Sequence, residues 1–207
     1  MTAEHLEILV EERSMEVFLR ELLPRLLGDE STFNIYPSQG KDDLLRNLPA
    51  RLSGYSRWLP SRWRVVIVVD RDDDDCQRLK AVMEEAALDA GLRTRDRGST
   101  LAWQVLNRVA IEELEGWYFG DWDAVREVYP KVPKTLPEKA AYRDPDNIAG
   151  GTWEALERIL QRAGYFESGL SKTEAARAIG RVVEPMRNRS RSFAVFRDAL
   201  LEAIQQD

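Results

Sequence analysis

The residues best suited to chemistry are carboxylates that directly follow an apolar run. Residues 65–69 form an unbroken β-branched series, which predicts a strand covered on both faces in the middle of a parallel sheet. Asp70, Asp72 and then residues 73–75, all aspartate, follow it. Ligands normally bind at the carboxyl edge of an open α/β sheet. Because five clustered carboxylates repel one another, we expect Asp70 and Asp72 to hold a hard divalent cation.

The three aspartates at 73–75 also have a structural interpretation. Aspartate is common at helix N-caps and in first turns, where its charge opposes the helix dipole. Apolar residues at helical spacing over 79–88 predict a helix directly after them. A cap explains Asp70 and Asp72 less well, because these two come straight off a buried strand.

Two further acidic groups occupy equivalent positions in the chain. Residues 6–10 predict a strand that ends in Glu11, and a helix over 15–27 follows with Glu16 in its first turn. A carboxylate at Glu16 would also be favoured by the helix dipole alone. Residues 101–110 predict another strand, and a helix expected from about Ile111 has at its entrance Glu112, Glu113 and Glu115. Each acidic group therefore lies where a strand gives way to a helix.

Basic residues that could bind phosphate occur in two places. Gly40 and Lys41 stand at the entrance of a helix expected over 41–52, where free backbone N–H groups and an ammonium could hold phosphate, although a plain loop glycine is the simpler interpretation. The C-terminal part of the chain has the one local basic patch, from which nucleic-acid contacts are expected for Arg187, Arg189 and Arg191.

Composition favours an α/β protein. The 207 residues are 43% hydrophobic and 32% charged, with a net charge of −6 and a pI near 5.1, so any nucleic-acid binding needs a local patch. One cysteine and one histidine exclude an internal disulfide, a cysteine zinc site and a histidine-based triad. No stretch approaches a membrane span or a signal peptide, so we expect a cytoplasmic protein.

The chain is expected to divide into three parts. Residues 1–129 carry the alternating strands and helices of the α/β domain. Residues 130–151 contain four prolines and a glycine pair, which indicates a loop-rich connection. Residues 152–207 predict three helices that pack on the first domain as a helical subdomain.

Several of these segments together resemble a known family. They are LVEERSMEVFLRELLP, QGK, VVDRDDDD, AIEELEGWYFGD and SKTEAARAI with RSFAVFRDAL. The combination is similar to a TOPRIM-like bacterial family of unknown function, which is related to the TOPRIM domain of overcoming-lysogenization-defect nucleases and is often encoded beside an ATPase in defence loci. The resemblance covers nearly the whole chain and implies a TOPRIM-like fold, with a mostly parallel central sheet flanked by helices.

The resemblance also implies roles for individual residues. Glu11, Asp70 and Asp72 match the acidic motifs of the TOPRIM module and would hold Mg²⁺ or Mn²⁺. Similarity to the nuclease type adds Glu113 and Glu115 as ligands or their helpers and Lys172 as a residue that assists phosphate chemistry. The sequence departs from the pattern at Met15, where a second glutamate is expected, and Glu16 could take its place.

Three hypotheses remain open. The first is a Mg²⁺- or Mn²⁺-dependent nuclease with a separate ATPase as partner and an oligomer possible. Its expected substrate is DNA, although the sequence does not separate DNA from RNA. The second is a catalytically degenerate interaction partner of the same fold. The third is a metal-dependent phosphatase for a small molecule. An aspartyl-phosphate role for Asp70, as in receiver domains, is less favoured because such domains do not account for the acidic group at residues 112–115.

Overall fold

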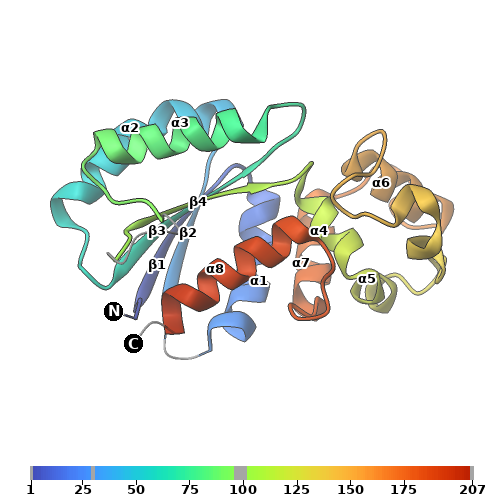
Figure 1. Cartoon of the computed structure of the whole chain (residues 1–207). Helices are drawn as coiled ribbons and strands as arrows, with labels where there is room; N and C mark the ends of the chain where they lie inside the picture. The colour runs from blue at the N-terminus through green and yellow to red at the C-terminus, as the bar shows by residue number, and fades with distance from the viewer. Residues whose placement is uncertain (1, 29–30, 96–101, 206–207) are drawn as a thin grey trace.

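The computed structural model describes residues 2–28, 31–95 and 102–205. Its centre is a sheet of four parallel strands in the order β2-β1-β3-β4 (Figure 1). The strands are β1 (His5–Val10), β2 (Thr32–Pro37), β3 (Trp63–Asp70) and β4 (Val105–Ala110). Helices flank the sheet, and the last helix is C-terminal, so the predicted α/β fold class is confirmed and is consistent with a TOPRIM-like arrangement of Rossmann type.

The strand order creates a switch point at the carboxyl edge of the sheet. The chain first adds β2 on one side of β1 and then adds β3 on the other side. Val10 at the end of β1 is in register with Val68, and Asp70 at the end of β3 is in register with Ala110. In open α/β sheets the crevice at such a reversal is the usual ligand site. Sequence and topology therefore point to the same edge.

Helices cover both faces of the sheet. One face carries α2 (Lys41–Trp58) and α3 (Cys76–Asp89), and the other carries α1 (Arg13–Leu27) and α8 (Arg191–Gln205) (Figure 1). The apolar residues of α1 recur at three- and four-residue spacing and are buried: Met15, Phe18, Leu19, Leu22 and Leu23. β3 lies between the two layers, which explains its continuous apolar run.

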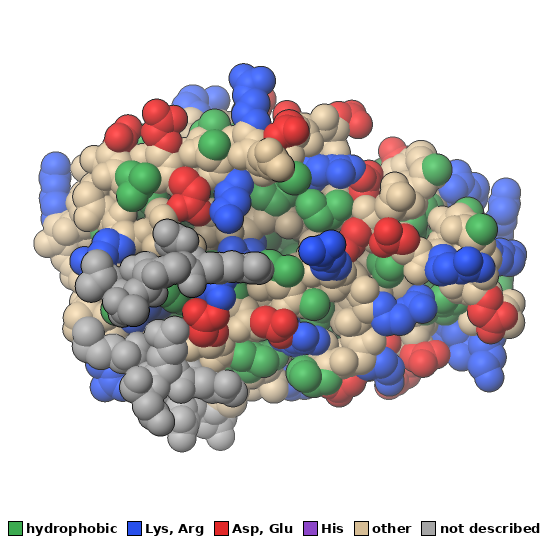
Figure 2. Space-filling view, in the orientation of Figure 1, with side chains coloured by type: hydrophobic (Ala, Val, Ile, Leu, Met, Phe, Trp, Pro, Cys, Tyr) green, Lys and Arg blue, Asp and Glu red, His purple; other side chains and the backbone are tan. Residues whose placement is uncertain are grey.

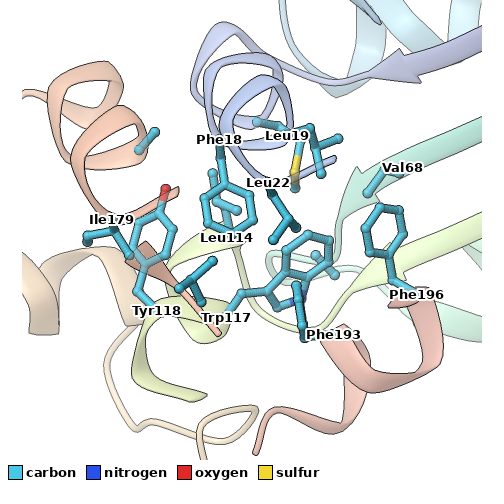
Figure 3. Close-up of a cluster of buried hydrophobic side chains, with 14 of the residues drawn as sticks. Phe18, Leu19, Leu22, Val68, Leu114, Trp117, Tyr118, Ile179, Phe193 and Phe196 are labelled. Atoms are coloured by element: carbon cyan, nitrogen blue, oxygen red, sulfur yellow. The ribbon is translucent and has the colours of Figure 1, made fainter. Parts of the chain in front are cut away.

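Trp117 organises the larger of the two cores. It lies in α4 (Leu114–Gly120), is fully buried, and has its ring 5.0 Å from that of Phe196 and 5.2 Å from that of Phe193 (Figure 3). Its Nε1 donates a hydrogen bond of 2.9 Å to Ser192 Oγ. This contact ties the segment that follows β4 to the start of α8.

The remaining helices join the same core. They are α5 (Trp122–Val128), α6 (Thr152–Arg162) and α7 (Lys172–Val182), and the segment between α5 and α6 contains two short 3₁₀ helices, Leu136–Glu138 and Ala140–Tyr142. α7 packs on α1, where Gly180 meets the backbone of Phe18. The C-terminal helices therefore complete one face of the α/β core. None of the helices in the described ranges is long and apolar enough to cross a membrane.

Three predicted boundaries differ from the structure by three residues or more. The helix expected from about Ile111 begins at Leu114, as α4. The helix expected over 41–52 continues to Trp58, because Leu52 and Tyr55 extend its buried stripe. The strand expected from residue 101 begins at Val105 as β4, and Leu101 lies outside the described residues.

We expect Gly120→Ala to destabilise the protein. A Cβ at Gly120 would lie 2.9 Å from Ser190 N and clash with the amide of Asn188, which are parts of the loop held against α4. Strain of this kind typically costs about 1–3 kcal/mol in the free energy of unfolding, measured by denaturant titration. Gly54→Ala is the matched control, because nothing lies within 4 Å of its Cβ position in α2, and it should stabilise the protein by about 0.5–1 kcal/mol. Equal effects of the two substitutions would contradict the assigned packing.

Candidate functional site

Glu11 and Asp70 meet at the switch point between β1 and β3. The backbone N–H of Asp70 donates to Glu11 Oε2 over 3.1 Å. The side chain of Asp70 is buried, and its Oδ1 has no hydrogen-bond partner among the described residues. Burial raises the pKa of Asp70 well above its ordinary value, and nearby charges raise it further, namely those of Glu11, Glu115, Glu12 and Asp72.

Carboxylates from three strand ends are therefore close enough to raise one another's pKa. Burial likewise raises the pKa of Glu11, with added repulsion from Asp72 and Glu12 and with partial relief from the Asp70 N–H and Lys41. The predicted residues Glu11, Asp70, Asp72 and Glu115 are thus brought together at one edge of the sheet. We call this group, together with Glu12, the acidic cluster.

The loops after β3 and β4 are bonded to each other. Arg71 N donates to Ala110 O and Asp72 N donates to Glu112 O, both over 2.9 Å, and the side chains of Arg71 and Glu112 form an ion pair. Asp72 has a φ of 47° and Glu112 a φ of 64°, which is uncommon for residues other than glycine. Backbone conformations of this kind concentrate at functional sites, where surrounding bonds hold them in place.

Lys41 neutralises the exposed side of the cluster. Its Nζ lies 2.7 Å from Asp72 Oδ2, 2.8 Å from Asp74 Oδ2 and 3.1 Å from the carbonyl oxygen of Arg71. Burial alone would lower the pKa of Lys41, but the bonds and charges of the two aspartates outweigh it and raise that pKa. Lys41, predicted to contact nucleic acid, therefore acts as an internal counter-ion for Asp72.

Lys172 reaches the other side of the cluster from the first residue of α7. Its Nζ lies 3.8 Å from Glu12 Oε1 and 4.9 Å from the centre of the Trp153 ring. Burial raises the pKa of Glu115 to about 7, with the Lys172 charge opposing the shift and the charges of Glu113 and Glu12 adding to it. The same carboxylates raise the pKa of Lys172 against the effect of its burial. Lys172 is therefore held within reach of the predicted ligands.

Two predicted ligands have other partners in the structure. Glu113 Oε2 accepts from Thr152 Oγ1 over 3.1 Å and from Trp153 N over 2.8 Å, so it caps the start of α6. Glu16 is paired with arginines on α1: its Oε2 lies 2.6 Å from Arg13 Nη1 and its Oε1 lies 2.8 Å from Arg20 Nε. Met15, at the position where the resemblance expects a glutamate, is buried in the core.

The predicted arginines differ in their surroundings. Arg187 makes two bonds to the buried carboxylate of Asp121, at 2.7 and 2.9 Å, and thereby holds the chain before α8 against α5. Arg189 and Arg191 are exposed. In the space-filling view, basic and acidic side chains alternate over the visible face, without one continuous basic stripe there (Figure 2).

Sequence reasoning did not assign a role to two residues of this region. Glu12 faces Lys172 and contributes to the raised pKa values of Asp70 and Glu115. Its position beside Glu11 at the end of a strand is the sequence feature from which this role could have been predicted. Tyr118 is buried with no hydrogen-bond partner for its hydroxyl in the described part of the chain, and burial together with the charges of Glu115 and Asp70 raises its pKa. Its sequence position in an aromatic run indicated only packing.

The donor atoms of the acidic cluster suit a hard divalent cation, but the side chains are not arranged around one ion. Its donors are carboxylate oxygens, and the unpartnered Oδ1 of Asp70 is a buried acceptor that a cation would satisfy. Among residues 2–28, 31–95 and 102–205, however, no three His, Cys, Asp or Glu side chains are grouped as ligands of one ion. Asp72 is held by Lys41, so binding a cation requires Asp72 to exchange partners.

We expect the metal-free protein to lose stability as the pH rises from about 4.5 to about 7. The folded chain holds a proton on Glu115 with a pKa of about 7, above its ordinary 4.5, so the stabilisation present at low pH is lost as the folded carboxyl ionises. Glu115→Gln should remove this part, on the order of 3 kcal/mol at pH 8. Denaturant titrations in EDTA at pH 5 and pH 8 measure it, with the exposed Glu85→Gln as control. An unchanged pH dependence in Glu115→Gln would contradict the burial of this charge.

Comparison with known proteins gives one match. The model of a family described as a domain of unknown function (DUF4276) matches residues 10–201. No curated protein and no solved structure matches the chain. The relationship to TOPRIM nucleases and to a neighbouring ATPase stays a prediction. Because the match spans nearly the full length, from the end of β1 into α8, the chain belongs to the DUF4276 family.

Proposed function

We propose that this protein is a divalent-metal-dependent phosphodiester hydrolase, a nuclease of TOPRIM type that acts on DNA. The observation that carries the proposal is the burial of Asp70 at the switch point, with an unpartnered Oδ1 and with four other carboxylates acting on it. A purely structural role does not explain the Asp70 carboxyl, because burying a carboxylate without a partner costs stability. Carboxylates whose pKa values are strongly perturbed by burial and neighbouring charges are typical of functional sites.

Asp70, Glu11 and Asp72 would hold the metal, with Glu115 and Glu12 next to them. Mg²⁺ or Mn²⁺ bound there would offset charge on the phosphate oxygens and lower the pKa of a bound water. The chain itself contributes rigid placement, since Glu11 directly follows β1, Asp70 ends the adjacent strand β3, and the Asp70 N–H donates to the Glu11 carboxylate. Glu115, with a pKa of about 7, can accept or donate a proton near neutral pH.

The two lysines would act on the substrate's phosphates. Lys172 carries its positive charge beside Glu12 and Glu115 and could neutralise the scissile phosphate or the leaving oxygen. Lys41 would move from Asp72 to a flanking phosphate when the metal binds, which keeps both charges paired. A separate ATPase would supply the energy-dependent step, and Arg189 and Arg191 would contact the flanking backbone of the strand.

A second candidate function is favoured by a specific observation. Lys41 already compensates Asp72, Glu16 is bound by two arginines, and Met15 is buried where a ligand is expected. A protein with these features could keep the fold as a catalytically degenerate interaction partner. The number of ions bound separates the two functions.

Asp70→Asn should abolish the activity while leaving the fold intact. The substitution keeps the shape of the side chain and removes the charge that burial opposes, so the folded protein should not lose stability. We expect a loss of about 100-fold or more in Mn²⁺-dependent cleavage of plasmid or single-stranded DNA. Asp73→Asn, an exposed aspartate in the same loop, is the matched control. Equal activity of Asp70→Asn and the unaltered protein would refute the assignment.

Lys41→Met should tighten Mn²⁺ binding. The substitution removes the ammonium that competes for Asp72, so we expect an affinity increase of about tenfold or less. Calorimetric titration gives both the affinity and the number of ions bound, with Lys139→Met, an exposed lysine of the 130–151 segment, as control. Absence of Mn²⁺ binding in both Lys41→Met and the unaltered protein would favour the degenerate partner instead.

A further inference from the structure

Lys172 stands at a position that the stability of its own helix does not explain. It is the first residue of α7, where the N-terminal partial charge of a helix disfavours a cation. Its side chain is 32% exposed, and Glu12 Oε1 lies 3.8 Å from its Nζ, beyond hydrogen-bonding distance. Lys172 Nζ donates no hydrogen bond to any residue that the structure describes. The three N–H donors of this ammonium therefore remain available to another acceptor.

The ring of Trp153 is the second group that holds this ammonium. Lys172 Nζ lies over the indole, 4.9 Å from its centre. Tryptophan attracts a cation more strongly than the other aromatic residues, at up to about 6 Å from the ring centre. Because the attraction comes from the ring quadrupole, the ring neither cancels the charge nor occupies an N–H donor. A lysine held in this way keeps both for a substrate.

Trp153 is itself fixed by the segment that follows β4. Its backbone N–H donates to Glu113 Oε2 over 2.8 Å, and Thr152 Oγ1 donates to the same oxygen over 3.1 Å. Thr152 is fully buried, and Glu113 directly precedes α4. One carboxylate oxygen therefore holds the first turn of α6 against the start of α4, and with it the backbone that carries the indole.

Glycines allow α6 to begin so close to α4. Gly150 and Gly151 both have a φ of 84°, which glycine adopts without strain, and they lead directly into Thr152. On α4, a Cβ at Gly116 would lie only 3.8 Å from Thr152 Cγ2, so a larger side chain there would meet α6. The glycine pair, which the sequence indicated only as part of a loop, thus brings the start of α6 to the acidic cluster.

We propose that Trp153 is a positioning residue for Lys172. The face of its indole holds the ammonium beside Glu12 and leaves the N–H donors for a substrate phosphate. Glu113, which the resemblance makes a metal ligand or a helper, acts in this arrangement by holding Trp153. The inference deepens the proposed function and rests on it for the phosphate that Lys172 meets.

The position of the lysine is measured by NMR on the full chain in EDTA, without substrate. In protein with ¹³C-labelled lysine, we expect the Cε–H signals of Lys172 to lie upfield of those of the exposed Lys139, because the ring current shields protons over the face of an indole. Lys172→Arg assigns the signals by their loss. Trp153→Leu should remove the upfield shift, and Trp153→Phe should keep part of it.

Cleavage of DNA measures what this position contributes. Trp153→Leu should lower kcat of the Mn²⁺-dependent reaction about tenfold and change KM less than about twofold, because Lys172 neutralises charge that develops in the transition state. Trp153→Phe should recover most of kcat, since a phenyl ring also attracts a cation. Trp63→Leu is the matched control: this half-buried tryptophan begins β3, and its loss should change neither kcat nor the Lys172 signals.

Three results would overturn the inference. Lys172 signals at the position of the Lys139 signals in the unaltered protein would do so even if Trp153→Leu fails to fold. Unchanged Lys172 signals in Trp153→Leu would show that Glu12 alone holds the ammonium. An unchanged kcat in Trp153→Leu, in a protein that cleaves DNA, would show that the contact does not act on the reaction.

The NMR measurement also separates this inference from the proposed function. A protein that cleaves DNA but has unshifted Lys172 signals retains the proposed function and loses the inference. If the protein cleaves nothing, the proposed function is lost and inorganic phosphate is the probe. Upfield Lys172 signals that move when phosphate is added then retain the inference, and signals that phosphate leaves unmoved overturn it.

Discussion

Repulsion among carboxylates at the carboxyl edge of the sheet is the constraint on which the rest of the site depends. Parallel strands bring their ends to one edge, so acids that are far apart in the sequence become neighbours there. The surrounding structure compensates part of their charge. Lys41 pairs with Asp72, Lys172 lies beside Glu12, and the Asp70 N–H bonds Glu11. Asp70 and Glu115 are buried, and their burial, reinforced by neighbouring carboxylates, raises their pKa values even though the Lys172 charge partly opposes the shift at Glu115.

The C-terminal helices belong to this arrangement although they are distant in sequence. α7 packs on α1 and its first residue is Lys172, so the same contact that closes the core also brings a cation to the carboxylates. Trp117 couples the segment after β4 to α8 through the rings of Phe193 and Phe196 (Figure 3). Glu115 lies two residues before Trp117, so the burial of this ring fixes the backbone that carries the carboxylate.

Sequence patterns predicted the sheet well and the side-chain partners poorly. The β-branched run of β3 and the spacing in α1 follow from burial alone, which is a local property of the sequence. The convergence of Glu11, Asp70 and Glu115 required only that parallel strands end at one edge. The partners of Lys41 and Glu16 could not be predicted in this way. Lys41 pairs with Asp72 because of the conformation of the loop after β3, and Glu16 pairs with Arg20 because the two residues lie one turn apart on the same helix. The end of α2 was also missed, since Trp58 lies in a stretch of aromatics and arginines without helical signature.

The partners of Asp72 and Glu16 decide between a catalytic and a degenerate protein. Glu16 is bound within its own helix by Arg13 and Arg20, so releasing it would leave two guanidiniums without a carboxylate. Asp72 is different, because both it and Lys41 have alternatives: a cation for the aspartate and a phosphate for the lysine. Substrate and metal arriving together would satisfy both groups, whereas either one alone would leave a charge unpaired. Under the proposed function, metal and phosphate would therefore bind jointly at this edge, as a metal-dependent phosphodiester hydrolase requires.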